Sequence, residues 1–584
     1  MRRFEVWSPL AKRLSLRVAG ADRAMEGPDD GGWWGLDVSE ASHGTDYGFL
    51  LDEDAEVYPD PRSRWQPHGV HGLSRVYDHG RFTWSDARFQ APPLASGIIY
   101  ELHVGTFSEE GTLSAAIEKL DYLVDVGVTH VELMPVAAYD GRHGWGYDGV
   151  ALFAVHEPYG GPDSLKRFVN AAHAKGLAVL LDVVYNHFGP SGNYTGKFGP
   201  YVTDSHRTPW GGAVNLEDAE SNEVRRFFCD NALMWMRDYH IDGLRLDAVH
   251  AFVDRSAIHF LEQLSREVEE LEAALARRLV LIAESDLNDP RVVTPREAGG
   301  FGIDAQWSDD FHHALFAVLC PKERGGYYAD FGSLALLAKA LERTFAYDGI
   351  YSRYRKRIHG KPPGNLSQHR FLGYIQNHDQ VGNRAIGERI VHIAGVERAK
   401  IAAATYLLGP FVPMLFQGEE WAASSAFQYF ADHYDRELAR RVSEGRKREF
   451  SAFGWAPETI PDPESPRTFE ASKLNWNEIN DPEHSEMLEW YRALIGLRRT
   501  TPCLQNGTSG NVLVAFDEVE KWLRMERGAI SMICNIGPED RSFPIPQASI
   551  LELTSRRSIV TADGAIILPP LSVAVLRAPS INNA

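Results

Sequence analysis

The chain has 584 residues, of which 44% are hydrophobic and 24% are charged, a balance typical of an ordered protein of several domains. Its 80 acidic and 60 basic side chains give a formal net charge of −20, so a basic surface for nucleic acid or anionic lipid would have to form against the overall field. We therefore expect no nucleic acid and no membrane as a partner. The four cysteines lack paired spacing and no apolar leader follows Met1, which favours a soluble, cytoplasmic protein.

Short strand-like runs occupy the first 90 residues. They cover residues 4–7, 14–18 and 47–51, and turns of Gly, Asp and Pro separate them at roughly the spacing of a β-sandwich. We predict a small immunoglobulin-like β-sandwich over residues 1–90. It serves either as a binding module or as a rigid wall of a cleft, and the two alternatives carry about equal weight.

Between residues 91 and 500, short apolar runs alternate with longer segments whose apolar residues recur every three or four positions. One such helical stripe joins Ala257, Leu261, Leu264, Val268, Leu271 and Leu275. Eight runs have the pattern of strands, at residues 98–103, 130–135, 177–186, 242–248, 279–285, 303–308, 371–377 and 411–417. Eight strand–helix units predict a (β/α)8 TIM barrel with insertions. A doubly wound sheet is the competing layout, but no Gly-x-Gly-x-x-Gly turn follows the first run.

After Thr500 the chain returns to short strand-like runs, such as residues 511–516 and 529–534, and shows no long helical pattern. We predict a closing antiparallel β-domain over residues 501–584. The fold class expected for the whole chain is therefore multidomain, with a catalytic-type barrel between two β-rich regions.

Polar side chains end four of the predicted barrel strands, and barrels of this kind build their active sites at these carboxyl ends. The residues collected in this way are Asn186 and His187 after the third strand, Arg245, Asp247 and His250 at the fourth, Glu284 at the fifth, and Asn377, His378 and Asp379 at the seventh. These residues are the candidates for chemistry.

Three of them are carboxylic acids whose surroundings suit different tasks. Arg245 and Asp247 lie two apart on a strand, so both side chains point to one face and the guanidinium keeps the carboxylate ionised. Glu284 follows four apolar residues, and apolar surroundings with nearby carboxylates raise a pKa toward that of a general acid. Asp379 adds a third acid. Three acids with no cofactor motif favour cleavage at an acetal carbon through a sugar oxocarbenium-like transition state.

Each of these features has a simpler interpretation when it stands alone. An Arg-x-Asp pair is often a structural ion pair, a Glu after an apolar run is often an exposed strand end, and an Asn-His-Asp sequence is most often a turn. Their joint presence at three strand ends of one barrel favours a catalytic site. A non-catalytic binding module is the alternative from another class, and it has no need to keep the three acids and Arg245 together.

The same segments resemble the α-amylase family of glycoside hydrolases, whose four motif regions match residues 182–187, 243–250, 283–285 and 377–379. The resemblance implies Asp247 as the nucleophile, Glu284 as the acid/base and Asp379 as the stabiliser of the transition state. It also implies that the substrate-binding residues are Arg245, His187, His378, Asn377, Tyr147 and, at the next subsite, His250. In this family the residue at the position of Asn186 can ligate calcium. Because no clear acidic cluster surrounds Asn186, we predict no metal, and we predict no cofactor.

Within that family, the layout is similar to the group of glycogen branching enzymes, debranching enzymes and maltooligosyltrehalose trehalohydrolases. The segments most similar to the last of these are residues 182–190, 301–313 and 376–384. This similarity implies hydrolysis of the α-1,4 bond beside the terminal trehalose of maltooligosyltrehalose, with trehalose and a maltooligosaccharide as products. It also implies functional pairing with a maltooligosyltrehalose synthase, and a branching or debranching enzyme stays the alternative.

Three residues at the end of the sixth predicted strand lie in reach of the trehalose end of such a substrate. They are Trp307, Asp309 and His312, and we expect them to bind it. Packing within the loop explains Trp307 about equally well.

Overall fold

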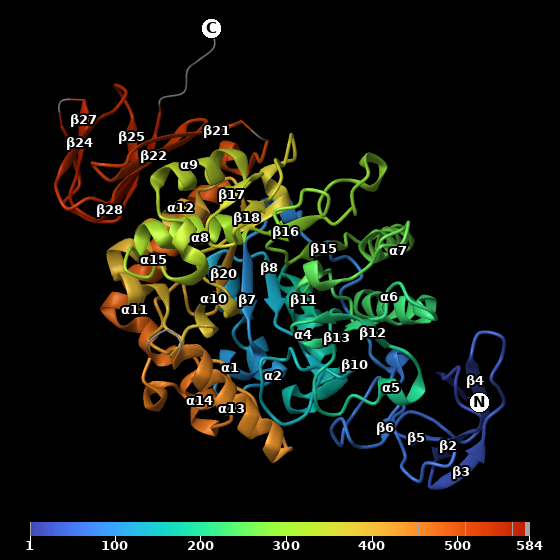
Figure 1. The fold of residues 1–584 in the computed structure, drawn as a ribbon. Coiled ribbons are helices and arrows are strands. Elements are labelled where there is room, and N and C mark those ends of the chain that lie inside the picture. Colours follow the sequence, from blue (N-terminus) through green and yellow to red (C-terminus); the bar gives the residue numbers. More distant parts are fainter. Residues whose placement is uncertain (1, 452–454, 509, 563, 579–584) are drawn as a thin grey trace.

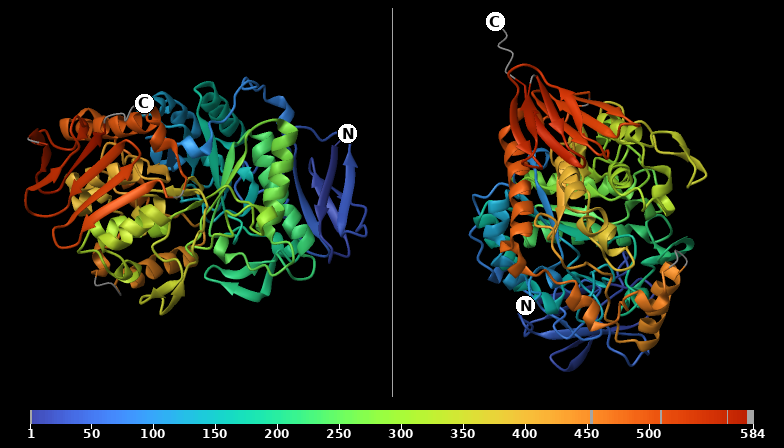
Figure 2. Two further views of the ribbon diagram at one scale, coloured as in Figure 1. Left: turned by 90° about the horizontal axis from the view of Figure 1, so that it is seen from above. Right: turned by 90° about the vertical axis from the view of Figure 1, so that its left-hand side faces the viewer.

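The computed structural model describes residues 2–451, 455–508, 510–562 and 564–578 of the chain. In this part, a central barrel lies between two β-rich regions (Figure 1). Figure 2 shows the N-terminal strands and the C-terminal sheets on opposite sides of the barrel. The multidomain fold class expected from the sequence is therefore confirmed.

Six N-terminal strands form two small antiparallel sheets. One sheet pairs β1 (Arg2–Trp7) with β4 (Trp33–Val38), and the other has the order β3-β2-β5-β6. Its strands are β2 (Leu14–Val18), β3 (Ala21–Ala24), β5 (Asp46–Leu51) and β6 (Ser74–Arg75). In β2 every second side chain is buried, as expected for a strand with one face on a core. The strand runs predicted here are confirmed, whereas the immunoglobulin-like type and the boundary at residue 90 stay predictions.

A buried ion cluster holds the segment between β6 and the barrel in place. Asp86 of this segment has its Oδ2 atom 2.7 Å from Nδ1 of His173 and 2.7 Å from Nδ1 of His240. The Nε2 atom of His173 lies 2.9 Å from Oδ2 of Asp242, so His173 stands between two carboxylates. Burial opposes the charged form of His173, but hydrogen bonds to the two carboxylates raise its pKa above the ordinary value.

Eight parallel strands of the described chain close into the barrel. They are β7 (Ile99–Leu102), β8 (His130–Leu133), β11 (Ala178–Val183), β14 (Gly243–Leu246), β15 (Val280–Ala283), β16 (Ala305–Trp307), β19 (Phe371–Gly373) and β20 (Val412–Phe416). Pairing of β20 with β7 closes the ring. All eight predicted strands are confirmed, but each ends earlier than predicted, and six of them also begin later.

Helices of very different lengths surround the strands. Their bounds are α1 (Val104–Phe107), α2 (Leu113–Ile117), α3 (Leu120–Val126), α4 (Gly161–Ala174), α5 (Thr195–Phe198), α6 (Ser221–Asp238), α7 (Phe260–Leu275), α8 (Asp309–Leu319), α9 (Leu334–Arg343), α10 (His378–Gly382), α11 (Ile390–Ala394), α12 (Val396–Leu407), α13 (Arg436–Ser451), α14 (Pro466–Ala471) and α15 (Pro482–Thr500). The predicted stripe from Ala257 to Leu275 lies on α7, but the helix begins only at Phe260, because the His259 ring caps it by accepting from the Leu261 N–H.

Three short hairpins also belong to the barrel region. They are β9 (Ala137–Ala138) with β10 (Ala151–Val155), β12 (Val202–Thr208) with β13 (Gly211–Val214), and β17 (Ile350–Ser352) with β18 (Arg357–His359). The β9–β10 pair follows β8 and the β12–β13 hairpin follows β11, whereas β17–β18 comes after α9 and lines one pocket with Asp286 and Asp309, which follow β15 and β16. The insertions therefore extend the face at which barrels of this type carry their active sites.

The C-terminal region consists of a five-stranded and a three-stranded antiparallel sheet. The larger sheet has the order β21 (Val512–Asp517), β22 (Trp522–Arg527), β23 (Ile530–Asn535), β28 (Ser572–Arg577) and β25 (Ile550–Thr554). The smaller one has the order β24 (Arg541–Pro544), β27 (Ala565–Leu568) and β26 (Val560–Ala562). The predicted strands are confirmed, and the domain edge at residue 500 stays a prediction.

A buried arginine joins the C-terminal region to the barrel. Arg527 of β22 donates through Nη1 to the carbonyl oxygens of Leu408 at 2.9 Å and Gly409 at 2.6 Å, and through Nη2 to that of Asn506 at 2.8 Å. Leu408 and Gly409 directly follow α12, so the guanidinium lies at the negative end of the helix dipole. None of the described helices combines the length and apolar composition needed to cross a bilayer.

Candidate active site

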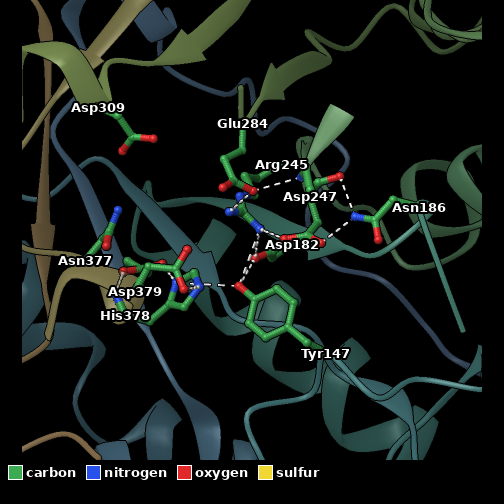
Figure 3. A network of polar contacts seen from close by, with 12 residues as sticks. Tyr147, Asp182, Asn186, Arg245, Asp247, Glu284, Asp309, Asn377, His378 and Asp379 are labelled. Atoms are coloured by element: carbon green, nitrogen blue, oxygen red, sulfur yellow. Dashed lines mark hydrogen bonds and ion pairs between the residues drawn. The ribbon is translucent and has the colours of Figure 1, made fainter. Parts of the chain in front are cut away.

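The three predicted acids meet at the carboxyl end of the barrel (Figure 3). Asp247 follows β14, Glu284 follows β15, and Asp379 lies in α10 after β19. Because parallel barrel strands all end at this face, residues far apart in the sequence converge there. Figure 3 shows Glu284 and Asp247 on either side of Arg245, with Asp379 on the other side of the site.

Arg245 is the centre of this network and is fully buried. Its Nη1 atom donates to Oδ2 of Asp182 at 2.7 Å and to Oδ1 of Asp247 at 2.9 Å, and its Nη2 atom donates to Oε2 of Glu284 at 2.8 Å. Burial opposes the charge on the guanidinium, but the surrounding carboxylates raise the pKa of Arg245 well above its usual value. A permanent cation is thus held between the two acids that would react.

Asp247 is fixed by donors on both of its oxygens. Arg245 binds Oδ1, and the side-chain amide of Asn186 donates to Oδ2 at 2.6 Å. The same amide donates to the backbone carbonyl of Asp247 at 2.9 Å. Charge-assisted bonds of this kind favour the ionised carboxylate and aim its lone pairs, which suits a nucleophile.

Glu284 has a different environment from Asp247. Burial raises the pKa of Glu284, and the negative charge of Asp247 raises it further, whereas Arg245 lowers it. Its Oε2 atom accepts from Arg245 and from the Ala248 N–H at 2.8 Å, and no described residue donates to Oε1. A carboxyl group with a raised pKa and one free oxygen can hold a proton and transfer it.

Asp379 is the most open of the three acids, with 35% of its side chain exposed. The Asn383 amide donates to its Oδ1 atom at 3.0 Å, and Nε2 of His378 lies 3.6 Å away from the same atom. Partial burial raises the pKa of Asp379, and the charge of Glu284 adds to this effect. Its exposure leaves the carboxyl group free to bind sugar hydroxyls.

His378 is a buried cation beside Asp379. Its Nδ1 atom lies 2.5 Å from Oε1 of Glu101, and its backbone N–H donates to Oε2 of the same residue at 2.9 Å. Burial alone would lower its pKa, but the carboxylates of Glu101 and Asp379 outweigh burial and raise it to about 9. The ring of Tyr147 stacks on that of His378 with centroids 5.0 Å apart, and its hydroxyl donates to Asp182 at 2.5 Å.

His187 lies on the side of the site formed by the loop after β11. Its Nε2 atom contacts the carbonyl oxygen of Tyr147 at 3.0 Å, and its ring is parallel to that of Trp210 with centroids 5.1 Å apart. Trp210, at the turn of the β12–β13 hairpin, is 47% exposed. The sequence reasoning missed this residue, although a Trp next to two glycines in a polar turn is a signal for an exposed ring. His250 is exposed in the turn that follows Asp247.

Trp307 does not reach the cleft, which corrects the prediction that it binds the trehalose end. It is only 1% exposed and belongs to the barrel interior. The guanidinium carbon of Arg245 lies over its ring at 4.1 Å. Trp307 therefore supports the arginine by a cation–π contact and has no free face for a sugar.

His312 is also buried, at 1% exposure, so its predicted contact with substrate is corrected as well. Its Nε2 atom lies 3.0 Å from the hydroxyl of Tyr328. Asn377 is fully buried, and its Oδ1 atom caps α10 by accepting from the Gln380 N–H at 2.8 Å. The amide nitrogen of Asn377 has no partner among the described residues.

Several residues that complete the site were not assigned a role from the sequence. Glu101 lies inside an apolar strand, and Asp182 was part of a motif without an assigned role. An acid within a buried strand is a signal in itself, because burial of an unpaired charge is costly. The side-chain amide of Asn186 donates a hydrogen bond to Asp247. In the described part of the chain, no group of three His, Cys, Asp or Glu residues could hold a metal ion.

Comparisons with known proteins find relatives that cover nearly the whole chain. The family model "Alpha amylase, catalytic domain" matches residues 75–207. A malto-oligosyltrehalose trehalohydrolase from Rhizobium sp. (strain M-11) is 47% identical over 98% of this chain and 97% of that protein. One from Mycobacterium tuberculosis is 47% identical over 99% of each chain. A crystal structure of a putative alpha amylase from Salmonella typhimurium has a TM-score of 0.90 and 38% identity, covering 98% of this chain and 97% of that one.

The fold and the site define the class of protein: the chain is a glycoside hydrolase of the α-amylase type. Within that class, the chain belongs to the malto-oligosyltrehalose trehalohydrolase family. A branching enzyme from Bacillus caldolyticus is more distant, at 26% identity over 83% of this chain.

Proposed function

We propose that this protein hydrolyses the α-1,4 bond next to the terminal trehalose of maltooligosyltrehalose and releases trehalose and a maltooligosaccharide. The observation that carries the chemistry is the bridge that one guanidinium makes between two carboxylates in unlike environments, Asp247 and Glu284. The trehalohydrolase names of the relatives support the substrate.

The proposed mechanism is a double displacement with retention. Asp247 attacks the anomeric carbon while Glu284 protonates the leaving oxygen, so the bond between that oxygen and the anomeric carbon breaks and a glycosyl-enzyme forms. Glu284 then removes a proton from water, which attacks the same carbon and releases Asp247. A retaining pair must stand ~5–5.5 Å apart. Shared binding to Arg245 supports such a close spacing.

The donor sugar would lie among the other residues of the site. The exposed carboxyl group of Asp379 can bind neighbouring hydroxyls, while the buried cations His378 and Arg245 lie beneath it and supply positive charge. Tyr147 and His187 close this side, and the exposed ring of Trp210 offers a stacking surface at the rim.

A small polar pocket lies beyond Glu284, and its mouth is where the disaccharide that leaves would bind. It is lined by Asp286, Asp309, Tyr327, Tyr354 and Arg355, among others. Arg355, from the β17–β18 hairpin, donates to Asp286 at 2.8 Å. Aromatic rings beside charged groups are what a compact, hydroxyl-rich disaccharide needs, because rings pack on its faces while charges bind its edges.

Two further points complete the proposal. We propose a functional pairing with a maltooligosyltrehalose synthase, which would supply the substrate, and a cytoplasmic location, consistent with four free cysteines. A branching or debranching enzyme, which uses the same acids, is the second candidate, and the distant branching-enzyme relative gives it weaker support.

The test is a product analysis. The purified protein is incubated with maltohexaosyl-trehalose, with a maltooligosaccharide of similar length and with amylose, and Glu284→Gln serves as the inactive control. We expect rapid release of trehalose and much slower attack on the other two. New α-1,6 branches on amylose with little trehalose would show a branching enzyme instead.

A further inference from the structure

Asp309 is a further carboxyl group at the site, and the mechanism above does not use it. It is the first residue of α8, directly after β16, and it lines the pocket beyond Glu284. Figure 3 shows its carboxyl group turned toward the space between Glu284 and Asp379. It thus faces the region that the leaving group of the substrate must cross.

A chain of buried polar groups holds one oxygen of Asp309. The hydroxyl of Tyr374 donates to Oδ1 at 2.6 Å, and the amide of Gln380 approaches the same atom at 3.4 Å. Gln380 in turn accepts from the Tyr328 hydroxyl at 3.0 Å, and that hydroxyl contacts His312 at 3.0 Å. Three segments of the chain therefore cooperate to orient one carboxyl group. Through these hydrogen bonds, His312 helps to position the Asp309 carboxyl group.

The other oxygen of Asp309 has no donor among the described residues, because Tyr374 and Gln380 both donate to Oδ1. A second polar group nearby is also unsatisfied: the amide nitrogen of fully buried Asn377 lacks a partner and points toward Asp309 in Figure 3. Because that nitrogen is enclosed by protein atoms, a ligand cannot reach it, whereas the second oxygen of Asp309 is not enclosed and can accept a hydrogen bond from a ligand.

We propose that Asp309 determines specificity for the leaving group, with its free carboxylate oxygen accepting a hydrogen bond from a hydroxyl of the departing trehalose unit. Tyr374 and Gln380 are then positioning residues that aim this carboxylate. The inference rests on the proposed function, because it assumes that trehalose occupies the pocket beyond Glu284.

The charges around Asp309 make this contact dependent on pH. Burial raises the pKa of Asp309 to about 7, the Tyr374 hydrogen bond opposes the rise, and nearby carboxylates add to it. Tyr374, Glu284, Asp379 and Asp286 act on its charge. The other titratable groups of the pocket that it lines are Asp310, His313, Tyr327, Asp330, Tyr347, Tyr354, Arg355 and His359. Below that pH the carboxyl group is protonated and loses its strength as a charged acceptor, so KM for the substrate should rise on the acid side.

The experiment compares the full-length wild type with Asp309→Asn on maltohexaosyl-trehalose and on maltooctaose, below and above a pH of about 7. Loss of a hydrogen bond to a charged group predicts a drop in kcat/KM for the trehalose substrate of about 10- to 100-fold, mainly through KM. The loss on maltooctaose should be smaller. The acid-side rise of KM should disappear in the variant.

Two further variants sharpen the test. Tyr374→Phe deletes only the hydroxyl group that donates to Asp309, so it should show the same change of substrate preference to a lesser degree. This variant also tests the inference if Asp309→Asn does not fold. Asp289→Asn removes a carboxylate that pairs with Arg291 outside the pocket, and it should behave like the wild type.

Equal losses on both substrates, or an unchanged pH dependence of KM, would overturn the inference and leave Asp309 a structural role. Such a result would not affect the proposed function, since the wild type would still release trehalose. If the wild type itself released no trehalose, the proposed function would fail first.

Discussion

Replacement of Arg245 can separate two effects of its guanidinium group: the positive charge and the fixed geometry of its hydrogen bonds. Arg245→Lys keeps a cation but not the planar fork that binds Asp182, Asp247 and Glu284 at once. Loss of at least two of three charge-assisted bonds, at about 1.5–3 kcal/mol each, predicts a decrease in kcat of about 10²- to 10⁴-fold. Arg245→Met removes the charge as well.

The two variants should differ in the pH dependence of kcat/KM, which reports the free enzyme. Arg245 lowers the pKa of Glu284, so removal of the cation lets that pKa rise and moves the alkaline limb to higher pH. Two unit charges about 4 Å apart at an effective dielectric constant of about 20 interact by about 4 kcal/mol, which sets the upper limit of this effect. The lysine variant, which keeps the charge, should move less.

Steady-state rates of trehalose release across pH measure both effects, and circular dichroism with a melting curve checks that each variant folds. The folding check matters because removal of one partner from a buried ion pair costs about 3–5 kcal/mol. If the alkaline limb of the kcat/KM profile of Arg245→Met stays in place or moves to lower pH, the reasoning about the pKa of Glu284 is refuted.

Two predictions concern stability. His173→Gln should lower the melting temperature, and the deficit should be full below the unfolded pKa near 6.5 and should shrink as pH rises through the higher folded pKa, because the wild type then loses the histidine charge that its two carboxylates bind. A deficit that grows with pH would contradict this sign. Arg527→Met leaves the carbonyl oxygens of Leu408 and Asn506 without a donor, whereas Gly409 keeps its bond from Arg498 at 2.9 Å. The change should cost about 2–6 kcal/mol in denaturant unfolding, and a loss below about 1 kcal/mol would show that water replaces the guanidinium.

The barrel and its three acids could be predicted because each depends on local sequence. A run such as residues 279–283 is apolar because β15 is buried on both faces, and Glu284 follows it because the strand ends where the cleft begins. The position of an acid at a strand end thus fixes its place in the fold. The amphipathic stripe of α7 was predictable for the same reason.

The partners of these residues could not be predicted, because they depend on contacts across the barrel. Nothing in the sequence near Trp307 indicates that Arg245 covers its ring. Nothing near Glu101 of β7 indicates that it binds His378 of α10. An aromatic or a histidine that follows a strand has the same local pattern whether it lines a cleft or lies beneath it. This ambiguity explains the wrong assignments of Trp307 and His312.

The arrangement of donors also explains how two similar carboxyl groups acquire different roles. Both oxygens of Asp247 accept from fixed donors, so its charge is stabilised in one orientation before substrate binds. Glu284 receives both of its donors on a single oxygen and keeps the other free. Because Arg245 donates to both carboxyl groups, a change of charge on one alters the electrostatic interaction of the same cation with the other. Glu284 gains a negative charge when it protonates the leaving group, and Asp247 loses its own when it bonds to the anomeric carbon. The pair beside Arg245 therefore carries one negative charge before and after the step, in addition to Asp182.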